Sequence, residues 1–263
     1  MDRRGAWAAV ALWAWLGGCS TMIEVEGTDG TSPESPEDRT DAAEPTDALD
    51  TGLVGCALDG RVVDEVGDPR AGVRVTLLAP LWESTAQTRV DGTFELTPVL
   101  ADVDTWYSLE LFPGDEAPSV RIPLDLSQCA TRTVEVRLPP RGAPAALPTE
   151  ADDVTVAEGL VMVAGVGSFV PPPFEEQATA LRATAATGLP LDGLPRPVVA
   201  AWFLEPVGHE VGEDPVPVRF SDVVDPERHR VWVADRFEGW RDVGPASNAS
   251  LDVLSTVVIT AEP

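Results

Sequence analysis

Beyond about residue 53, the chain follows a period of two in which apolar and polar side chains alternate. In "GVRVTLL", Val73, Val75 and Leu77 fall on one side, while Arg74 and Thr76 fall on the other. The same alternation recurs in three further runs, "WYSLELF", "VRIPLDL" and "RTVEVRL". Strict alternation is typical of strands that bury one face. The sequence therefore predicts an all-β fold.

Turn signals separate these runs. "VGDPRAG" is one such cluster, and Asp91-Gly92 in "RVDGTFEL" suits the positive φ angles of a tight hairpin turn. About seven short strands are expected between residues 53 and 140, a density typical of an antiparallel β-sandwich.

The remainder of the chain predicts a second antiparallel sandwich, over residues 151–263. The prolines of "LPPRGAPAALPTE" indicate a stiff linker, which we place at residues 141–150. Residues 174–187 are ambiguous, because their Ala and Glu content favours a helix and their threonines do not. The strand-like sequence on both sides favours a strand here. The runs expected to form strands are "DVTVAEGLVMVAG", "RPVVAAWFLEP", "DPVPVRF", "RHRVWVADRFEGWRDVG" and "LSTVVITAE".

The first residues have the pattern of a targeting signal. Arg3 and Arg4 precede an apolar run of about 12 residues, whereas roughly 20 are needed to cross a bilayer. This pattern predicts a secretory signal. Its end, "LGGC", resembles the bacterial lipobox, which implies cleavage after residue 18 and acylation of Cys19 with palmitate or a similar chain. The alternative is an ordinary signal followed by a chance cysteine.

Residues 19–52 predict a disordered acidic tether. They are rich in Asp, Glu, Ser, Thr and Pro, and Arg39 is their one basic residue. Such a segment cannot bury enough apolar surface to offset its ordering entropy. A disordered leader without a role is the alternative. By analogy with lipoprotein sorting, Ser20 directly after the anchor favours the outer membrane. Whether the protein faces the periplasm or the cell surface is left open.

Charge limits the partners. The chain has 44 acidic and 18 basic residues, a formal net charge of −26. It would repel nucleic acid and anionic lipid headgroups. We therefore expect no nucleic-acid partner, and membrane contact only through the acyl anchor.

Three cysteines are present. With Cys19 acylated, Cys56 and Cys129 remain in an oxidising compartment, and we predict that they form a disulfide. Closing a loop of about seventy residues would contribute on the order of 4 kcal/mol on the chain-entropy model. Two buried free thiols are the alternative.

The first sandwich resembles the carboxypeptidase regulatory-like domain, a transthyretin-like β-sandwich. This resemblance implies a non-catalytic accessory role. The matching positions are Gly60, Gly67, Pro69, Gly72, Asp91, Gly92, Phe94, Tyr107 and Leu109.

The second sandwich is loosely similar to ZU5-like or Ig-like modules of envelope proteins, which implies a structural or binding role. The matching positions are Pro206, Gly208, Pro215, Val216, Val218, Phe220, Val231, Val233, Trp240, Val243 and Gly244.

No nucleophile elbow, phosphate loop or dinucleotide fingerprint occurs in the sequence. We therefore predict no catalytic, cofactor-binding or metal-binding residues and no enzymatic activity. The alternative function is an envelope metal-dependent hydrolase that uses His209 and His229. A further open possibility is Ca²⁺ in the acidic loops, with ligands from Asp64, Glu65, Asp68, Asp102 and Asp104.

Together these features predict a lipid-anchored protein of the bacterial cell envelope. Its non-catalytic sandwiches would serve adhesion, envelope assembly or ligand binding, with a protein or carbohydrate partner in the envelope. The sequence does not define the ligand or the oligomeric state.

The anchor can be tested by metabolic labelling. Cells fed radiolabelled palmitate should label the wild-type chain, and Cys19→Ala should lose the label because its thiol is the acyl acceptor. Equal labelling of the two chains would contradict the lipoprotein interpretation.

Overall fold

The alternating runs form strands in the computed structural model, which describes residues 54–80, 82–101, 106–126, 131–191, 193–195 and 197–262. The predicted all-β class is confirmed, since the single helical element in these ranges is a 3₁₀ turn, η1 (Pro226–Arg228). No helix in the described ranges has the length and apolarity to cross a membrane. The predicted signal, the tether, Cys19 and Cys129 lie outside the described residues.

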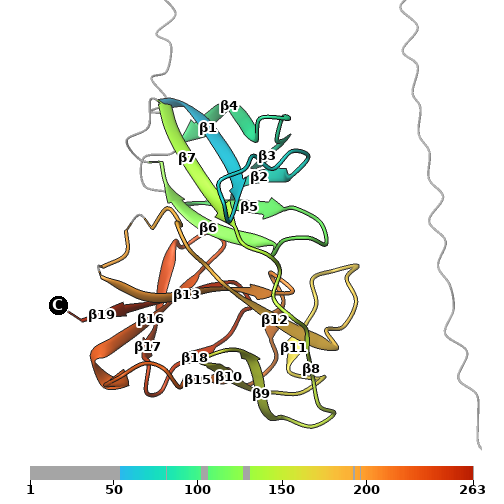
Figure 1. The fold of residues 1–263 in the computed structure, drawn as a ribbon, viewed down its shortest axis with the longest axis vertical. Helices are drawn as coiled ribbons and strands as arrows, with labels where there is room; N and C mark the ends of the chain where they lie inside the picture. Colours follow the sequence, from blue (N-terminus) through green and yellow to red (C-terminus); the bar gives the residue numbers. More distant parts are fainter. Residues whose placement is uncertain are drawn as a thin grey trace, which may run out of the picture. The chain divides into compact units, whose positions relative to one another are not determined.

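The N-terminal half contains seven strands in two sheets, of order β4-β1-β7 and β3-β2-β5-β6 (Figure 1). Between them lies one core, in which Leu58, Leu77 and Leu109 are fully buried. The strands are β1 (Val54–Asp64), β2 (Arg74–Ala79), β3 (Trp82–Gln87), β4 (Thr93–Ala101), β5 (Trp106–Phe112), β6 (Val120–Asp125) and β7 (Thr131–Leu138).

Two pairings differ from the expected antiparallel hairpins. β1 and β7 pair in parallel, from Ala57 opposite Thr131 to Asp64 opposite Leu138. Asp91-Gly92 does form a tight turn, with Gly92 at φ 77°, but β3 and β4 belong to different sheets. The hairpin prediction is therefore wrong, and the turn is a corner between the two layers. Hydrogen bonds from the Thr93 hydroxyl and then its backbone N–H lower the pKa of Asp91.

The C-terminal half packs a six-stranded sheet, β17-β16-β19-β13-β12-β8, and a four-stranded sheet, β18-β15-β10-β9, around a second core. β11 and β14 form a separate short pair. The strands are β8 (Ala145–Ala146), β9 (Asp152–Ala157), β10 (Leu160–Ala164), β11 (Phe169–Val170), β12 (Ala180–Ala185), β13 (Val198–Glu205), β14 (Glu210–Val211), β15 (Val216–Phe220), β16 (His229–Ala234), β17 (Trp240–Pro245), β18 (Ser250–Leu251) and β19 (Thr256–Ala261).

The ambiguous segment 174–187 and the predicted linker 141–150 both contain a strand. Within residues 174–187, Ala180–Ala185 form β12, as the flanking sequence predicted, because they pair with β13. Within the predicted linker 141–150, Ala145–Ala146 form β8 and pair with β12. This stretch thus extends the second half's large sheet.

The two halves meet along β6, which packs against β13, β16 and β19. Phe203 of β13 is fully buried as part of the N-terminal core, and the Thr256 hydroxyl donates to the Arg121 carbonyl. The Trp106 ring lies against Gly193 and Gly239, where an added Cβ would come within 2.6 and 2.5 Å of ring atoms. The described residues belong to one compact unit, so the division into two domains stays a prediction.

Gly239 provides a test of this junction. Gly239→Ala should destabilise the protein by about 1 kcal/mol for the left-handed backbone and by about 1–3 kcal/mol more for the clash with Trp106. Gly114→Ala is the matched control, since its φ is 84° against 83° for Gly239 and no atom lies within 4 Å of its added Cβ. Urea unfolding should show the larger loss for Gly239→Ala, and equal losses would contradict the described packing.

Candidate functional site

A groove of about 810 Å³ lies where the two halves meet. The ends of β5 and β6 form one wall, and β14, the β16–β17 hairpin and the segment before β19 form the other. The loop after β11 closes one side. The lining residues are Glu110, Phe112, Arg121, Val170, Pro171, Pro172, Pro173, Glu175, Val207, Gly208, Glu210, Val211, Asp235, Arg236, Arg241, Asp252 and Val253.

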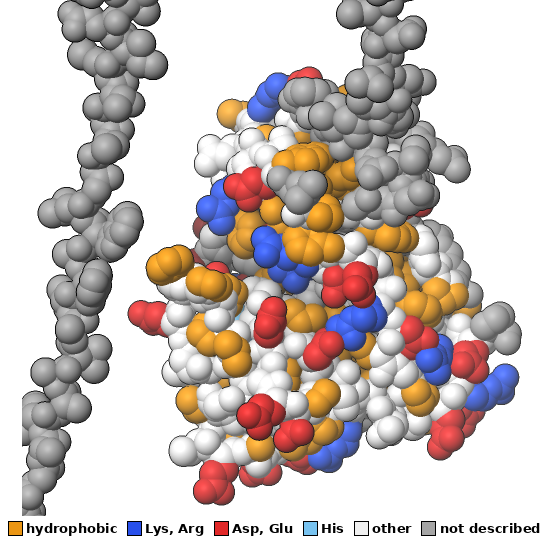
Figure 2. Space-filling view, turned by 180° about the vertical axis from the view of Figure 1, so that it is seen from behind, with side chains coloured by type: hydrophobic (Ala, Val, Ile, Leu, Met, Phe, Trp, Pro, Cys, Tyr) orange, Lys and Arg blue, Asp and Glu red, His pale blue; other side chains and the backbone are white. Residues whose placement is uncertain are grey.

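Most charges in the groove wall are neutralised in pairs. Arg121 and Glu110 form a buried pair at 2.8 Å, with side chains 8% and 9% exposed. Arg241 pairs with Asp252 and, at 3.8 Å, with Asp235. Acidic and basic side chains likewise lie side by side over the face shown in Figure 2. The groove therefore presents ordered polar groups with a small excess of negative charge.

Three charged lining residues keep polar atoms available for a ligand. Glu175 is 55% exposed. Glu210 is exposed, and neither it nor Arg236 has an ion pair within the described part of the chain. The Arg236 guanidinium lies over the Phe237 ring, 5.3 Å from its centroid. These groups can accept and donate hydrogen bonds at the groove's open side.

Phe174 lies in the chain between Pro173 and Glu175, two residues that line this groove. Its relative exposure is 107%, the highest among the described large apolar side chains. Its backbone is left-handed, with φ 72°, a conformation that costs a non-glycine residue about 1 kcal/mol. Pro171–Pro173 restrict the chain before it, and the Glu175 N–H donates to the Pro172 carbonyl at 3.1 Å. The loop thus presents a bare aromatic ring to solvent.

His209 lies beneath the same loop. Its side chain is 2% exposed, and Nε2 is 3.3 Å from the Glu176 carbonyl oxygen. Nδ1 has no hydrogen-bond partner among the described residues, and it lies 3.9 Å from a Glu175 carboxylate oxygen. Both imidazole nitrogens therefore face the loop that carries Phe174.

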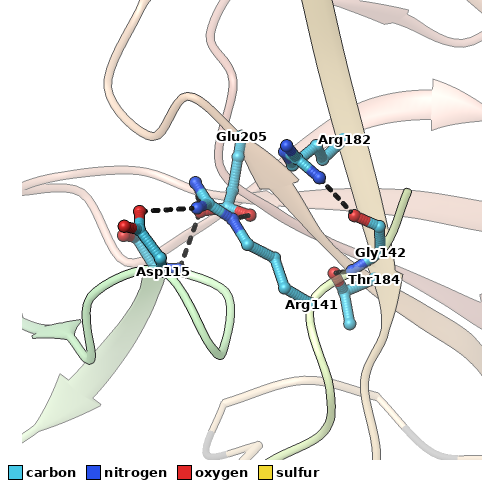
Figure 3. A network of polar contacts seen from close by, with 7 residues as sticks. Asp115, Arg141, Gly142, Arg182, Thr184 and Glu205 are labelled. Carbon is cyan, nitrogen blue, oxygen red and sulfur yellow. Dashed lines mark hydrogen bonds and ion pairs between the residues drawn. The ribbon is translucent and has the colours of Figure 1, made fainter. Parts of the chain in front are cut away.

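A buried carboxylate at Glu205, 3% exposed, braces the two halves beside the groove (Figure 3). It accepts hydrogen bonds from the Ser119 N–H at 2.9 Å and from Arg141 Nε and Nη2 at 2.9 and 3.0 Å. Gly142, next in the chain, donates its N–H to the Thr184 hydroxyl and accepts from Arg182. Because these contacts join β6, β12 and β13, they fix the separation of the groove walls.

The structure does not bring His209 and His229 together. The His209 carbonyl accepts from Leu254 before β19, whereas His229 pairs with Ala261 at the other end of that strand. Seven residues of extended chain separate these contacts by roughly 20 Å. A joint metal site is therefore not formed. In the described ranges, no group of three or more His, Cys, Asp or Glu side chains could hold a metal ion.

The other predicted residues lie apart from the groove. Cys56 is buried in the N-terminal core, and its pairing with Cys129 stays a prediction because Cys129 lies outside the described residues. Asp64 accepts from the backbone N–H groups of Val66 and Asp68, and Asp102 and Asp104 are not among the described residues.

Sequence reasoning missed Phe174 and the groove. The local signal was present in "PPPFEE", an aromatic residue between a proline run and two carboxylates. The groove itself has no local signal, since its two walls come from segments more than eighty residues apart.

No family model matches the chain, and no curated protein does. Similar solved structures include a proposed carbohydrate-binding protein from Bacteroides uniformis, at 8% identity and TM-score 0.27, with 78% of each chain covered. The Bacillus anthracis TIE protein matches at 10% identity and TM-score 0.27, over 76% of this chain and 44% of its own. Scores this low give no basis for transferring a function.

The brace at Glu205 can be tested by charge removal. Arg141→Met should lower the free energy of unfolding by about 2 kcal/mol, because Glu205 stays buried without its main partner. Arg70→Met is the matched control: Arg70 is 29% exposed against 26% for Arg141, but its partner Glu116 is 81% exposed. A surface pair of this kind contributes at most about 1 kcal/mol. Equal destabilisation in urea unfolding would argue against the brace.

Proposed function

We propose that this chain is a lipid-anchored, non-catalytic protein of the bacterial envelope and that its groove binds a saccharide. The observation that carries the proposal is Phe174, a fully exposed ring held by a strained backbone at the rim of a polar groove. Residues with a strained backbone concentrate at active sites and ligand clamps.

The chemistry of the groove suits a sugar ring. A pyranose has an apolar face of C–H groups, which packs on an aromatic ring, and a rim of hydroxyls, which both donate and accept hydrogen bonds. Phe174 supplies the ring, Glu175 and Glu210 supply acceptors, and Arg236 supplies donors. The open shape of the groove suits a length of polysaccharide better than a single enclosed sugar.

Charge favours a neutral saccharide. The groove lining contains five carboxylates and three guanidiniums, and the whole chain carries a formal charge of −26. An anionic glycan would therefore meet repulsion at long range as well as in the groove.

Chain connectivity agrees with display from a membrane. β1 begins at Val54, and its far end, at Asp64, pairs with Leu138, from which the chain continues into the C-terminal half. An anchor at Cys19 would thus join the N-terminal half at the end of β1 that is remote from this crossing. The lipobox-like "LGGC" and the acidic tether support the anchor, and the carboxypeptidase regulatory-like resemblance supports an accessory role.

Phe174→Ala tests the saccharide site. Calorimetric titration with neutral glucan, mannan and N-acetylglucosamine oligosaccharides should detect binding to the wild-type chain. Loss of the ring should weaken that binding by about tenfold, since aromatic packing contributes about 1–1.5 kcal/mol.

Phe174→Tyr keeps the ring and should bind as the wild type does. Val224→Ala removes a 78%-exposed side chain away from the groove and should have no effect. If none of the neutral oligosaccharides binds, or if Phe174→Ala binds them unchanged, the saccharide proposal is wrong. An oligogalacturonate serves as the anionic comparator and should bind more weakly.

A further inference from the structure

We propose that His209 is a positioning residue for the loop that carries Phe174, and that a proton taken up at His209 Nδ1 moves this loop. The imidazole is attached to a fixed part of the fold. Gly208 N–H donates to the Leu254 carbonyl at 2.8 Å, and the Leu254 N–H donates to the His209 carbonyl at 2.9 Å. The loop, by contrast, is irregular from Pro171 to Thr179.

The contacts of the imidazole define its neutral form. A carbonyl oxygen only accepts, so Nε2, at 3.3 Å from the Glu176 carbonyl, carries the proton. Nδ1 then presents a lone pair toward the Glu175 carboxylate, 3.9 Å away, and cannot bond it. In this state Glu175 is free to line the groove.

A second proton changes this contact. Histidine is the side chain that ordinarily gains its charge between pH 5 and 8. With a proton on Nδ1, a charge-assisted hydrogen bond to Glu175 would form at about 2.8 Å. Closing the gap draws Glu175 toward His209 and takes a carboxylate away from the groove. Phe174 follows, because it is the adjacent residue.

The remaining charged groups around His209 leave Glu175 as the partner. Glu176 is on the same loop and contacts the imidazole through its carbonyl oxygen. Glu210 is on β14 and exposed. On the neighbouring elements, Arg121 is paired with Glu110 and Asp252 with Arg241. Glu175 is the carboxylate within ion-pair distance of Nδ1 among the described residues.

The loop movement can be measured without any ligand. In the full-length chain, purified in detergent, 4-fluorophenylalanine at position 174 reports the ring's surroundings by ¹⁹F NMR. Its resonance should shift as the pH is lowered and His209 takes up its second proton. The shift should vanish in His209→Gln, whose amide can still donate to Glu176 but does not titrate, and should be mostly lost in Glu175→Gln.

Glu210→Gln, which removes a neighbouring groove carboxylate, should leave the titration unchanged. A resonance that does not move in the wild-type chain, or that moves equally in His209→Gln, overturns the proposal. Should His209→Gln fail to fold, Glu175→Gln carries the test, because Glu175 is 55% exposed and its change leaves the core intact.

The consequence for binding rests on the saccharide site proposed above. Affinity for the neutral oligosaccharides should be about three- to tenfold weaker at the acid end of the ¹⁹F titration than at its alkaline end, because one hydrogen-bonding carboxylate is withdrawn. Glu175→Gln should lose this pH dependence. A titrating ¹⁹F resonance without saccharide binding would refute the saccharide function and leave the role of His209 standing. Saccharide binding with a resonance that does not titrate would refute the role of His209 and leave the saccharide function standing.

Discussion

The packing of β6 against the six-stranded sheet is the contact on which the rest of the structure depends. Through this contact, β6 of the N-terminal half lies over β13, β16 and β19 of the C-terminal half. As a result, Phe203 enters the N-terminal core and Trp106 lies against Gly193 and Gly239. Apolar burial supplies the attraction here, and the buried Glu205 carboxylate, with Arg141 and the Ser119 N–H, fixes the register. A shift of either sandwich would expose buried apolar side chains or leave the buried Glu205 carboxylate without its partners.

The groove is a consequence of that junction. Its walls carry ion pairs that are already satisfied, such as Arg121–Glu110, and therefore hold their places without a ligand. The loop from Pro171 to Gln177 is different. The Gln177 amide holds its end by donating to the Val166 and Phe169 carbonyls, but Phe174 and Glu175 lie in an irregular turn that the buried His209 imidazole contacts. The groove walls are stable and the adjoining loop is less constrained, so a change of charge at His209 can alter which side chains of this loop face the groove.

The period of two identified the strands well, because burial of one strand face is recorded locally in every second side chain. Val216, Val218 and Phe220 are buried as their alternation predicted, and β12 formed where helix and strand were both possible. The sequence was less informative about which strands pair with one another. Asp91-Gly92 does turn, but it leads β4 to β1 instead of to β3, and β7 joins β1 in parallel. Which strand lies beside which depends on contacts distant in sequence.

By itself, the sequence determined the all-β class, the position of most strands and an acidic surface, and it predicted an anchor at Cys19. Each of these depends on neighbouring residues or on summed composition. Only the tertiary structure decided the candidate site, because Glu110, Glu210 and Arg236 share no motif and line one groove only when β6 packs against the large sheet. It also separated His209 from His229, since opposite ends of β19 hold them apart whatever their spacing along the chain.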